Sequence, residues 1–202
     1  MPGWLTMGFA VAAGFLLPCM FWLCRWQGWP FWWCGIVLLP LALPRRAGGG
    51  MLAAGLPRAA KWLPGALAAF IGGAALVLRD GLPLQYYPVA VNVLFFCVFA
   101  ASLAQEQSLI ERLARRAEPD LPPAGRRYVR RVTQAWCAFF AANGALALWS
   151  IGAGEAVWAF YNGFVAYLLM GAMFAGEWLV RGRVKRRIRD EAAAPCGKTP
   201  HA

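Results

Sequence analysis

The chain has 202 residues, of which 60% are hydrophobic and 14% are charged, and its formal net charge is +11. A soluble domain of this length needs a far more polar exterior, so the composition excludes an ordinary soluble domain and predicts a membrane protein. The positive charge lies only at the ends of apolar segments, a distribution that argues against a nucleic-acid partner.

Six uncharged apolar runs predict membrane-crossing helices. A helix crosses a hydrocarbon core of about 30 Å with about 20 mainly apolar residues. We therefore expect an all-α fold, a polytopic transmembrane bundle that forms a single domain over residues 1–184. The predicted helices lie at about 4–24, 28–44, 62–78, 82–104, 133–153 and 157–180.

The first three of these runs differ from the others in length or context. Run 4–24 lacks a basic n-region and is too long for a typical signal-peptide core, so we expect it to be retained. Runs 28–44 and 62–78 contain 17 residues each, which is short for a full crossing. The sequence leaves open whether these two runs span the membrane fully.

Basic residues alternate between the two ends of the predicted segments. Connections on one side hold only Arg25 and Arg79, whereas those on the other side hold four, seven and seven basic residues. Basic residues favour the cytoplasmic side, so the pattern predicts a multi-pass protein of the bacterial inner membrane with both termini in the cytoplasm. A four-helix arrangement, in which 28–44 and 62–78 form a re-entrant pair, would keep this orientation.

Tryptophans crowd the first turn on the opposite, outer side of the predicted bundle. Amphipathic rings favour the membrane interface, so we interpret these side chains as anchors, with a ligand-stacking surface as the alternative. They are Trp26, Trp29, Trp32 and Trp33.

The longest connection, 105–132, is predicted to lie in the cytoplasm. Apolar residues from Leu109 to Ala117 recur at helical spacing beside arginines, which predicts a short interfacial helix that the prolines at 119, 122 and 123 end. A second basic patch then leads into the fifth segment and is a candidate surface for anionic lipid headgroups or soluble proteins. It comprises Arg126, Arg127, Arg130 and Arg131. A topology signal without recognition is the alternative, and the tail 185–202 is predicted to be disordered.

Cysteine and histidine usage gives no sign of metal chemistry. The six cysteines show no metal-ligand spacing, and we interpret them as small buried hydrophobic residues. The only histidine, His201, lies in the tail, which argues against a histidine-based metal site or catalytic dyad. We therefore predict no metal and no cofactor.

Four polar side chains fall within apolar segments, where they are functional candidates because burial in hydrocarbon is costly. They are Asn92, Asn143, Asn162 and Glu177. Asn143 and Asn162 each precede a glycine, which lets another helix approach while the amide bonds across the gap. Helix packing and the lining of a substrate path are the two interpretations. Glu177 stands four residues before Arg181, a spacing that predicts an ion pair, with a proton-coupled or catalytic carboxylate as the alternative.

Two further carboxylates, Glu118 and Asp120, lie in the long connection. They could bind a metal or act as acid and base toward a phosphate held by Arg126 and Arg127. Membrane transferases usually present a His-Asp or multi-Asp cluster, and the sequence contains neither, nor does it contain a GxSxG elbow, a P-loop or a GxGxxG motif. We assign no catalytic residue.

Three stretches resemble a family of small bacterial inner-membrane proteins that are often encoded beside fatty-acid-synthase-like enzymes for aryl polyene and xanthomonadin-type pigments. The stretches are YYPVAVN at 86–92, SLIERLARRAEPDLPPAGRRYVRRVTQAWCAFFAANGALALW at 108–149 and YNGFVAYLLMGAMFAGEWLVRGRV at 161–184. The resemblance implies a Gram-negative inner-membrane protein that works with pigment or lipid biosynthesis. It implies no mechanism and no catalytic residue.

Three classes of function stay open. The first is an accessory or scaffold protein that holds soluble biosynthetic enzymes at the cytoplasmic face and binds the bilayer and its anionic headgroups. The second is a transporter or flippase of a lipid-like product, for which few helices would favour a homo-oligomer. The third is a membrane-embedded transferase.

Overall fold

The computed structural model describes residues 20, 23–24, 26–34, 36, 63–117 and 122–193. Every regular element within these ranges is helical, which confirms the all-α prediction for this part of the chain. The predicted segments 4–24 and 28–44 lie largely outside the described residues, as do Glu118, Asp120 and the tail beyond residue 193.

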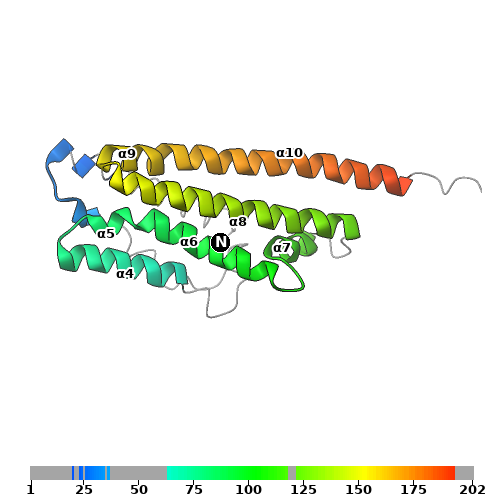
Figure 1. The fold of residues 1–202 in the computed structure, drawn as a ribbon, viewed down its shortest axis with the longest axis horizontal. Helices are drawn as coiled ribbons and strands as arrows, with labels where there is room; N and C mark the ends of the chain where they lie inside the picture. The colour runs from blue at the N-terminus through cyan, green and yellow to red at the C-terminus, as the bar shows by residue number, and fades with distance from the viewer. Residues whose placement is uncertain are drawn as a thin grey trace, which may run out of the picture.

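Among the described residues, three helical stretches are long and apolar enough to cross a membrane, namely Leu82–Leu103, Pro123–Gly152 and Glu155–Val184. The helices that lie side by side are α4 (Leu63–Leu78), α6 (Tyr87–Leu103), α8 (Pro123–Gly152) and α10 (Ala166–Ala193). Figure 1 shows them in the spatial order α10, α8, α6, α4. The short helix α5 (Leu82–Gln85) precedes α6 in the first of the long stretches. The described part of the chain thus contains three candidate spans, and α4 is a shorter apolar helix beside them.

Helix α8 begins well before residue 133, where the sequence predicts the apolar segment to start. Pro122 is extended and Pro123 occupies the first turn, where its fixed φ suits a helix and its missing N–H leaves no bond unmade. The basic patch therefore lies on a helix rather than in a loop. Helix α10 likewise continues to Ala193, through part of the tail predicted to be disordered, because neither proline nor glycine interrupts residues 183–193.

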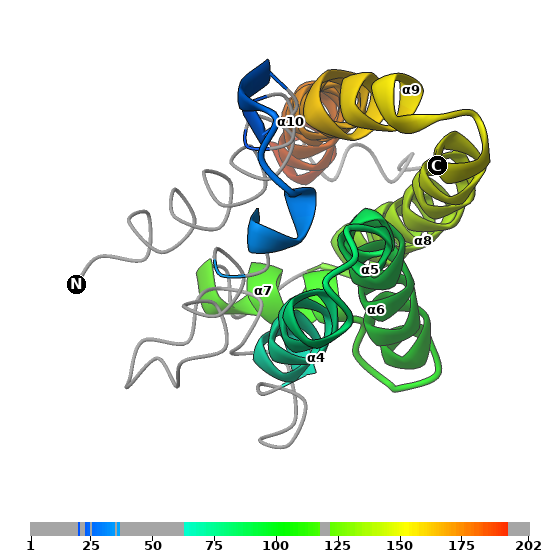
Figure 2. The ribbon, with the colours of Figure 1, turned by 90° about the vertical axis from the view of Figure 1, so that its left-hand side faces the viewer.

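The predicted interfacial helix is present as α7 (Leu109–Ala117) and lies across the end of the long helices (Figures 1 and 2). Its first turn is capped, since the Ser108 hydroxyl accepts the Glu111 N–H at 3.4 Å. The same hydroxyl lies 3.2 Å from the Thr133 hydroxyl of α8, and the Leu109 N–H donates to the Ser102 hydroxyl of α6 at 3.1 Å. Helix α7 is therefore fixed to both neighbours.

A buried cluster of aromatic and aliphatic side chains packs these elements together. Phe99 of α6 and Phe140 of α8 meet edge to face with ring centroids 5.3 Å apart, and Leu109 of α7 is buried in the same cluster. Trp136 of α8 contacts Phe174 of α10 with a centroid separation of 4.8 Å. Helices α6, α7, α8 and α10 thus share one apolar core.

The last membrane stretch is irregular near its start. After a turn at Gly154, whose φ of +106° favours glycine, α9 (Glu155–Phe160) leads into a π-helix, η3 (Tyr161–Val165), and then into α10. The Trp158 indole N–H donates to the Gln85 carbonyl oxygen at 3.0 Å, at the point where α5 gives way to α6. This bond satisfies a carbonyl that the helix break leaves free.

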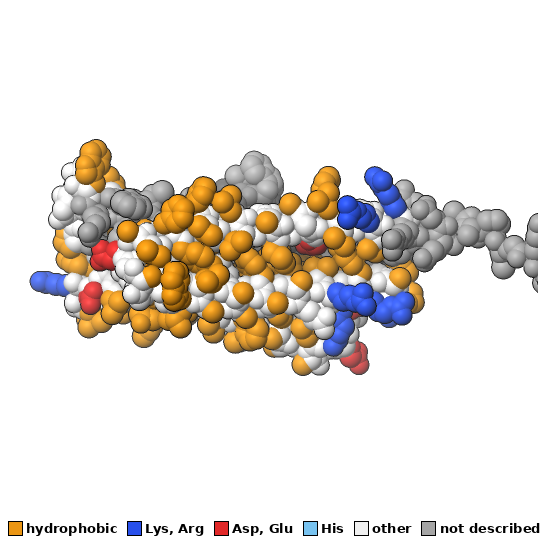
Figure 3. Space-filling model, turned by 45° about the horizontal axis from the view of Figure 1, so that its top comes forward, with side chains coloured by type: hydrophobic (Ala, Val, Ile, Leu, Met, Phe, Trp, Pro, Cys, Tyr) orange, Lys and Arg blue, Asp and Glu red, His pale blue; other side chains and the backbone are white. Residues whose placement is uncertain are grey.

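The surface of the described residues matches a membrane environment. Figure 3 shows hydrophobic side chains over the middle of the molecule, and most Lys and Arg side chains together at the end that carries the start of α8 and the last part of α10. Large apolar side chains are exposed along the helices, including Phe70, Val77, Trp149 and Trp178. Lipid rather than water is the solvent that such a belt requires.

Candidate functional site

Two of the predicted intramembrane amides meet at the centre of the bundle. The Asn143 amide N–H of α8 donates to the Asn92 side-chain oxygen of α6 at 3.0 Å. The Tyr161 hydroxyl, in the first position of the π-helix, donates to the Asn143 side-chain oxygen at 2.8 Å. All three side chains are buried. We call Asn92, Asn143 and Tyr161 the amide network.

Close helix contact makes the amide network possible. A Cβ atom added at Gly144 would lie 3.1 Å from the Asn92 Cβ atom, which is closer than ordinary van der Waals contact. The absence of a side chain at Gly144 therefore lets α6 and α8 approach at the level of Asn92. The Asn92 amide N–H in turn donates to the Pro88 carbonyl oxygen on its own helix at 2.8 Å.

The third predicted amide, Asn162, lies in the π-helix and makes a separate connection. Its amide nitrogen lies 3.2 Å from the Ser150 hydroxyl oxygen of α8 and 2.9 Å from the Trp158 carbonyl oxygen one turn earlier. A π-helical turn shifts the backbone ladder and frees carbonyls, so a side-chain amide at this point replaces a lost partner. Asn162 thereby ties the irregular turn to α8.

The chemistry available to these amides is hydrogen bonding. Among the described residues, every buried side-chain nitrogen or oxygen atom has a hydrogen-bond partner. The amide side chains and the tyrosine hydroxyl bond to one another and so link the helices. An amide side chain supplies neither an acid nor a base. The geometry favours helix packing over a polar path for a substrate.

The Glu177 side chain is half-buried on α10 and forms no ion pair with Arg181, although both side chains are described. The predicted pairing is therefore not seen. The backbone carbonyl oxygen of Glu177 instead accepts a hydrogen bond from the Tyr128 hydroxyl of α8 at 3.3 Å. Residue 177 thus marks a contact between α8 and α10 near their charged ends.

The predicted basic patch forms part of a larger cationic surface. Its side chains are all exposed, and they come from the first turns of α8 and the last turns of α10, which Figure 3 shows at one end of the molecule. We call this surface the basic end: Arg126, Arg127, Arg130, Arg131, Arg181, Arg183 and Arg186.

Two contacts hold the basic end in place. The Arg130 guanidinium donates to the Leu103 carbonyl oxygen at 2.8 Å, which caps the last turn of α6 with a cation. The Tyr128 contact to the Glu177 carbonyl oxygen joins α8 to α10. Glu118 and Asp120, the carboxylates proposed to act beside this patch, lie outside the described residues.

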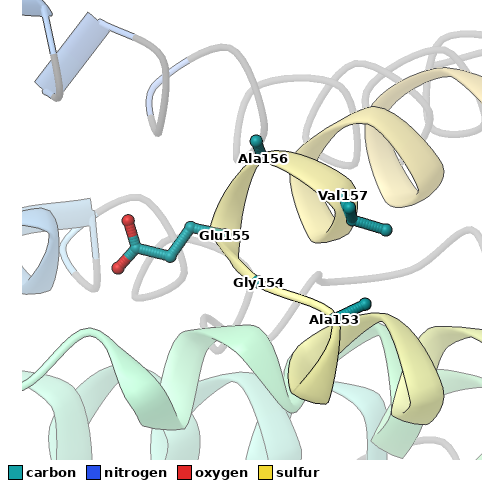
Figure 4. A pocket seen from close by; sticks show the side chains of 5 residues that line it. All are labelled: Ala153, Gly154, Glu155, Ala156 and Val157. Carbon is teal, nitrogen blue, oxygen red and sulfur yellow. The ribbon is translucent and has the colours of Figure 1, made fainter.

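Two hollows on the described surface lack the grouped acids and bases of a catalytic cleft. A hollow of about 390 Å³ lies at the turn Ala153–Val157, and Figure 4 shows the Glu155 carboxylate pointing away from Ala153 and Val157. A shallow groove of about 200 Å³ between α6 and α8 is lined by Val, Phe, Ala, Gly and Leu side chains. Gly144 of that groove lies directly against the amide network.

Sequence reasoning identified the asparagines because a polar residue is conspicuous in an apolar run. It missed Tyr161, Ser150, Ser108 and Thr133, whose hydroxyls make the connections described above. Ser108 could have been found, because serine followed three residues later by Glu111 is a capping-box pattern before an apolar run. No cluster of three His, Cys, Asp or Glu side chains that could hold a metal occurs within the described ranges.

Comparison with known proteins gives one informative similarity. The chain is 34% identical over 120 residues to the inner membrane-spanning protein YciB of Chromohalobacter salexigens, an alignment that covers 57% of this chain and 61% of that protein. The chain therefore spans less than two thirds of its relative's length. No family model matches the chain, and no solved structure matches it.

The similarity and the apolar helices lead to the same conclusion. The relative is named for spanning the inner membrane. Three helices of the described residues are long and apolar enough to cross a membrane, so both findings indicate that lipid surrounds these helices. The chain is a multi-pass integral protein of the inner membrane and a distant homologue of the inner membrane-spanning protein YciB.

Proposed function

We propose that this protein is an accessory or scaffold protein of the inner membrane that holds soluble biosynthetic enzymes at the cytoplasmic face. The basic end is the surface that binds them, and it also contacts anionic lipid headgroups. This role requires no acid, base, metal or cofactor from the chain. It makes the protein a partner of the enzymes rather than an enzyme itself.

One observation carries the proposal: seven exposed arginines are presented by two helices whose positions are fixed by the bundle. Basic residues that only set topology can lie in any irregular loop. Here the arginines lie on the parts of α8 and α10 that extend beyond the apolar belt. The Arg130 contact to the Leu103 carbonyl oxygen and the Tyr128 contact to the Glu177 carbonyl oxygen hold those helices in place. A preorganised cationic surface binds an acidic partner with little loss of conformational entropy.

The resemblance to pigment-associated membrane proteins supports the class of product. It favours soluble enzymes that build a lipid-like, aryl polyene type chain, whose apolar product must reach the membrane. A scaffold that binds the enzymes beside the bilayer would shorten that transfer.

Recruitment of the soluble enzymes tests the proposal. Soluble enzymes that build an aryl polyene type chain are co-expressed with the protein, and the fraction that sediments with inner membranes is measured. Exposed ion pairs between side chains contribute about 0.2–1 kcal/mol each, so neutralising four arginines should weaken binding of the enzymes by about tenfold. The variant carries Arg127→Gln, Arg131→Gln, Arg183→Gln and Arg186→Gln, which spares the structural contact of Arg130.

Two controls separate charge from folding. Lysine at the same four positions keeps the charge and should retain the enzymes, and Arg79→Gln removes an exposed charge at the opposite end and should have no effect. Unchanged sedimentation of the enzymes with the four-glutamine variant would contradict the proposal. Loss of recruitment on Asn143→Leu, in protein that is still folded and inserted, would also count against it.

Transport of a lipid-like product is the second candidate, favoured by the apolar groove between α6 and α8. Its lining suits an acyl or polyene chain, and it opens where lipid contacts the helices. The two candidates differ in what a deletion strain accumulates. A complete product stranded in the inner leaflet indicates transport, whereas truncated or unattached intermediates indicate a failure to hold the enzymes together.

A further inference from the structure

We propose that Cys24 and Cys34 form a disulfide bond that closes the turn between the predicted membrane segments 4–24 and 28–44. This inference is independent of the proposed function. It revises the interpretation of these two cysteines as inert hydrophobic residues, because the structure places residues ten apart in the sequence in direct contact. Their Sγ atoms lie 3.6 Å apart.

The local structure explains why the two thiols meet. Helical residues end at Gln27, Gly28 adopts a φ of +68°, and the Trp29 N–H donates to the Cys24 carbonyl oxygen at 2.8 Å. This bond and the left-handed glycine form a Schellman motif, which reverses the chain at the end of a helix. The 3-10 helix η1 (Phe31–Cys34) then returns Cys34 to the level of Cys24.

The buried surroundings of the two cysteines keep their side chains next to each other. Both cysteines are almost fully buried, with exposed fractions of 2% for Cys24 and 0% for Cys34. They pack in one apolar cluster with Ala68, Ala75 and Leu84 of α4 and α5. The Sγ atoms lie 3.6 Å apart, and a disulfide bond requires them to approach to about 2.05 Å.

The position of the turn supplies the chemical environment. It contacts α4 and α5 at the end of the molecule opposite the basic end, as Figures 1 and 3 show together. The basic end belongs in the cytoplasm by the positive-inside rule, so this turn faces the oxidising periplasm, where disulfides form and persist.

The oxidant is a protein disulfide of the thiol-oxidase class that acts on exported chains. One cysteine thiolate attacks the oxidant disulfide and expels one of its sulfurs as a thiolate, which gives a mixed disulfide. The second cysteine attacks its partner's sulfur in that mixed disulfide and releases the other oxidant sulfur. The two cysteine S–H bonds break, one S–S bond forms, and the oxidant disulfide becomes a dithiol. Because both cysteines are buried in the folded protein, the exchange takes place before the turn packs.

Thiol trapping in cells tests the disulfide. The full chain, with its other cysteines replaced by alanine, is expressed in a Gram-negative host, and thiols are blocked with N-ethylmaleimide under acid-quenched, denaturing conditions. Reduction and labelling with a mass-tagged maleimide then count the cysteines that were oxidised. We expect the monomer band to shift by the mass of two tags. In a host that lacks the periplasmic thiol oxidase, the tagged fraction should fall at least tenfold.

Matched variants identify the pair. Cys34→Ser leaves Cys24 without a partner and should abolish tagging, and so should Cys24→Ser. A variant that keeps only Cys97 of α6, which is exposed, and Cys137 of α8, which is buried, should be blocked before reduction. Blocking of Cys24 and Cys34 without reduction in the oxidising host, or a disulfide-linked dimer, overturns the proposal. The tags are counted on the chain that keeps both Cys24 and Cys34, so the result does not depend on whether a serine variant folds.

Discussion

Asn143 uses both ends of its side chain at once. Its amide N–H donates to Asn92 on α6, and its oxygen accepts the hydroxyl of Tyr161 on the π-helix. Leucine has neither group, and aspartate would lack the donor and bring a charge into the bundle. An amide is the side chain that can connect an acceptor on one helix to a donor on another.

Removing this side chain should destabilise the bundle. Asn143→Leu leaves the Asn92 oxygen without its donor and the Tyr161 hydroxyl without its acceptor. Buried polar groups without partners cost about 1–3 kcal/mol in soluble proteins, and interhelical hydrogen bonds in membranes contribute about 0.6 kcal/mol on average. We expect the free energy of unfolding to fall by about 1–3 kcal/mol, measured by reversible unfolding in mixed detergent micelles.

A double-mutant cycle shows whether the lost stability belongs to the network. Tyr161→Phe removes the hydroxyl that bonds to Asn143, so the double variant should lose less than the sum of the two single losses. We expect a coupling energy of about 0.5–2 kcal/mol. Phe164→Leu, at an exposed position of the same π-helix, is the control and should change little. Strictly additive losses would mean that the bond contributes nothing.

At the scale of elements, the approach of α6 to α8 depends on the absence of a side chain at one position. Gly144 faces Asn92 so closely that an added Cβ would lie 3.1 Å from the Asn92 Cβ atom. The stacked rings of Phe95 and Phe140, with centroids 5.2 Å apart, fill the interface one turn away. Bulky and small side chains therefore alternate along the contact.

Gly144→Leu should push these helices apart. Overpacking a filled interface costs about 1–3 kcal/mol, and the substitution also displaces the Asn92 amide. We expect Gly144→Leu to lower the amount of denaturing detergent that unfolding requires. The loss should be smaller in the Asn143→Leu background, where the bond to Asn92 is already absent. Gly171→Leu is the matched control, because an added Cβ on Gly171 of α10 meets no atom within 4 Å. Equal stability of the two glycine variants would refute the close approach.

The sequence predicted where the helices lie better than where they end. Apolar runs gave the positions of α4, α6, α8 and α10, because hydrophobicity reports the solvent of a segment. Helix bounds depend on hydrogen bonding and caps instead, so α8 begins at Pro123 and α10 runs to Ala193, both beyond the apolar runs. The amide partners of Asn143 depend on contacts between distant segments, for which spacing along one chain gives no signal.

The whole molecule is asymmetric along its long axis. The basic end and α7 lie at one extremity of the bundle. The Gly154 turn and the turn that contains Cys24 and Cys34 lie at the opposite extremity (Figures 1 and 3). Exposed tryptophans mark the latter end, where Trp26 has an exposed fraction of 85%. Such an arrangement suits one orientation in a bilayer with an anionic cytoplasmic leaflet.

Labelling of single cysteines in a cysteine-free background should reveal this orientation. Ala156→Cys lies at the turn after α8 and should react with a membrane-impermeant maleimide in intact spheroplasts. Arg127→Cys at the basic end should react at least tenfold less until the membrane is permeabilised. The reverse pattern would place the basic end outside and would remove the basis for both the scaffold role and the disulfide.

The π-helix has a consequence for the angular phase of the final segment. A π turn holds one residue more than an α turn, and each α-helical residue advances the helix by about 100°. If Tyr161–Val165 formed an ordinary α-helix with the same five residues, all of α10 would therefore be rotated by about 100° relative to α9. Trp158 would still meet Gln85, but Phe174 would turn away from Trp136, which it now contacts at 4.8 Å. The π turn absorbs one additional residue and thus determines which side of a 28-residue helix faces the protein and which side faces lipid.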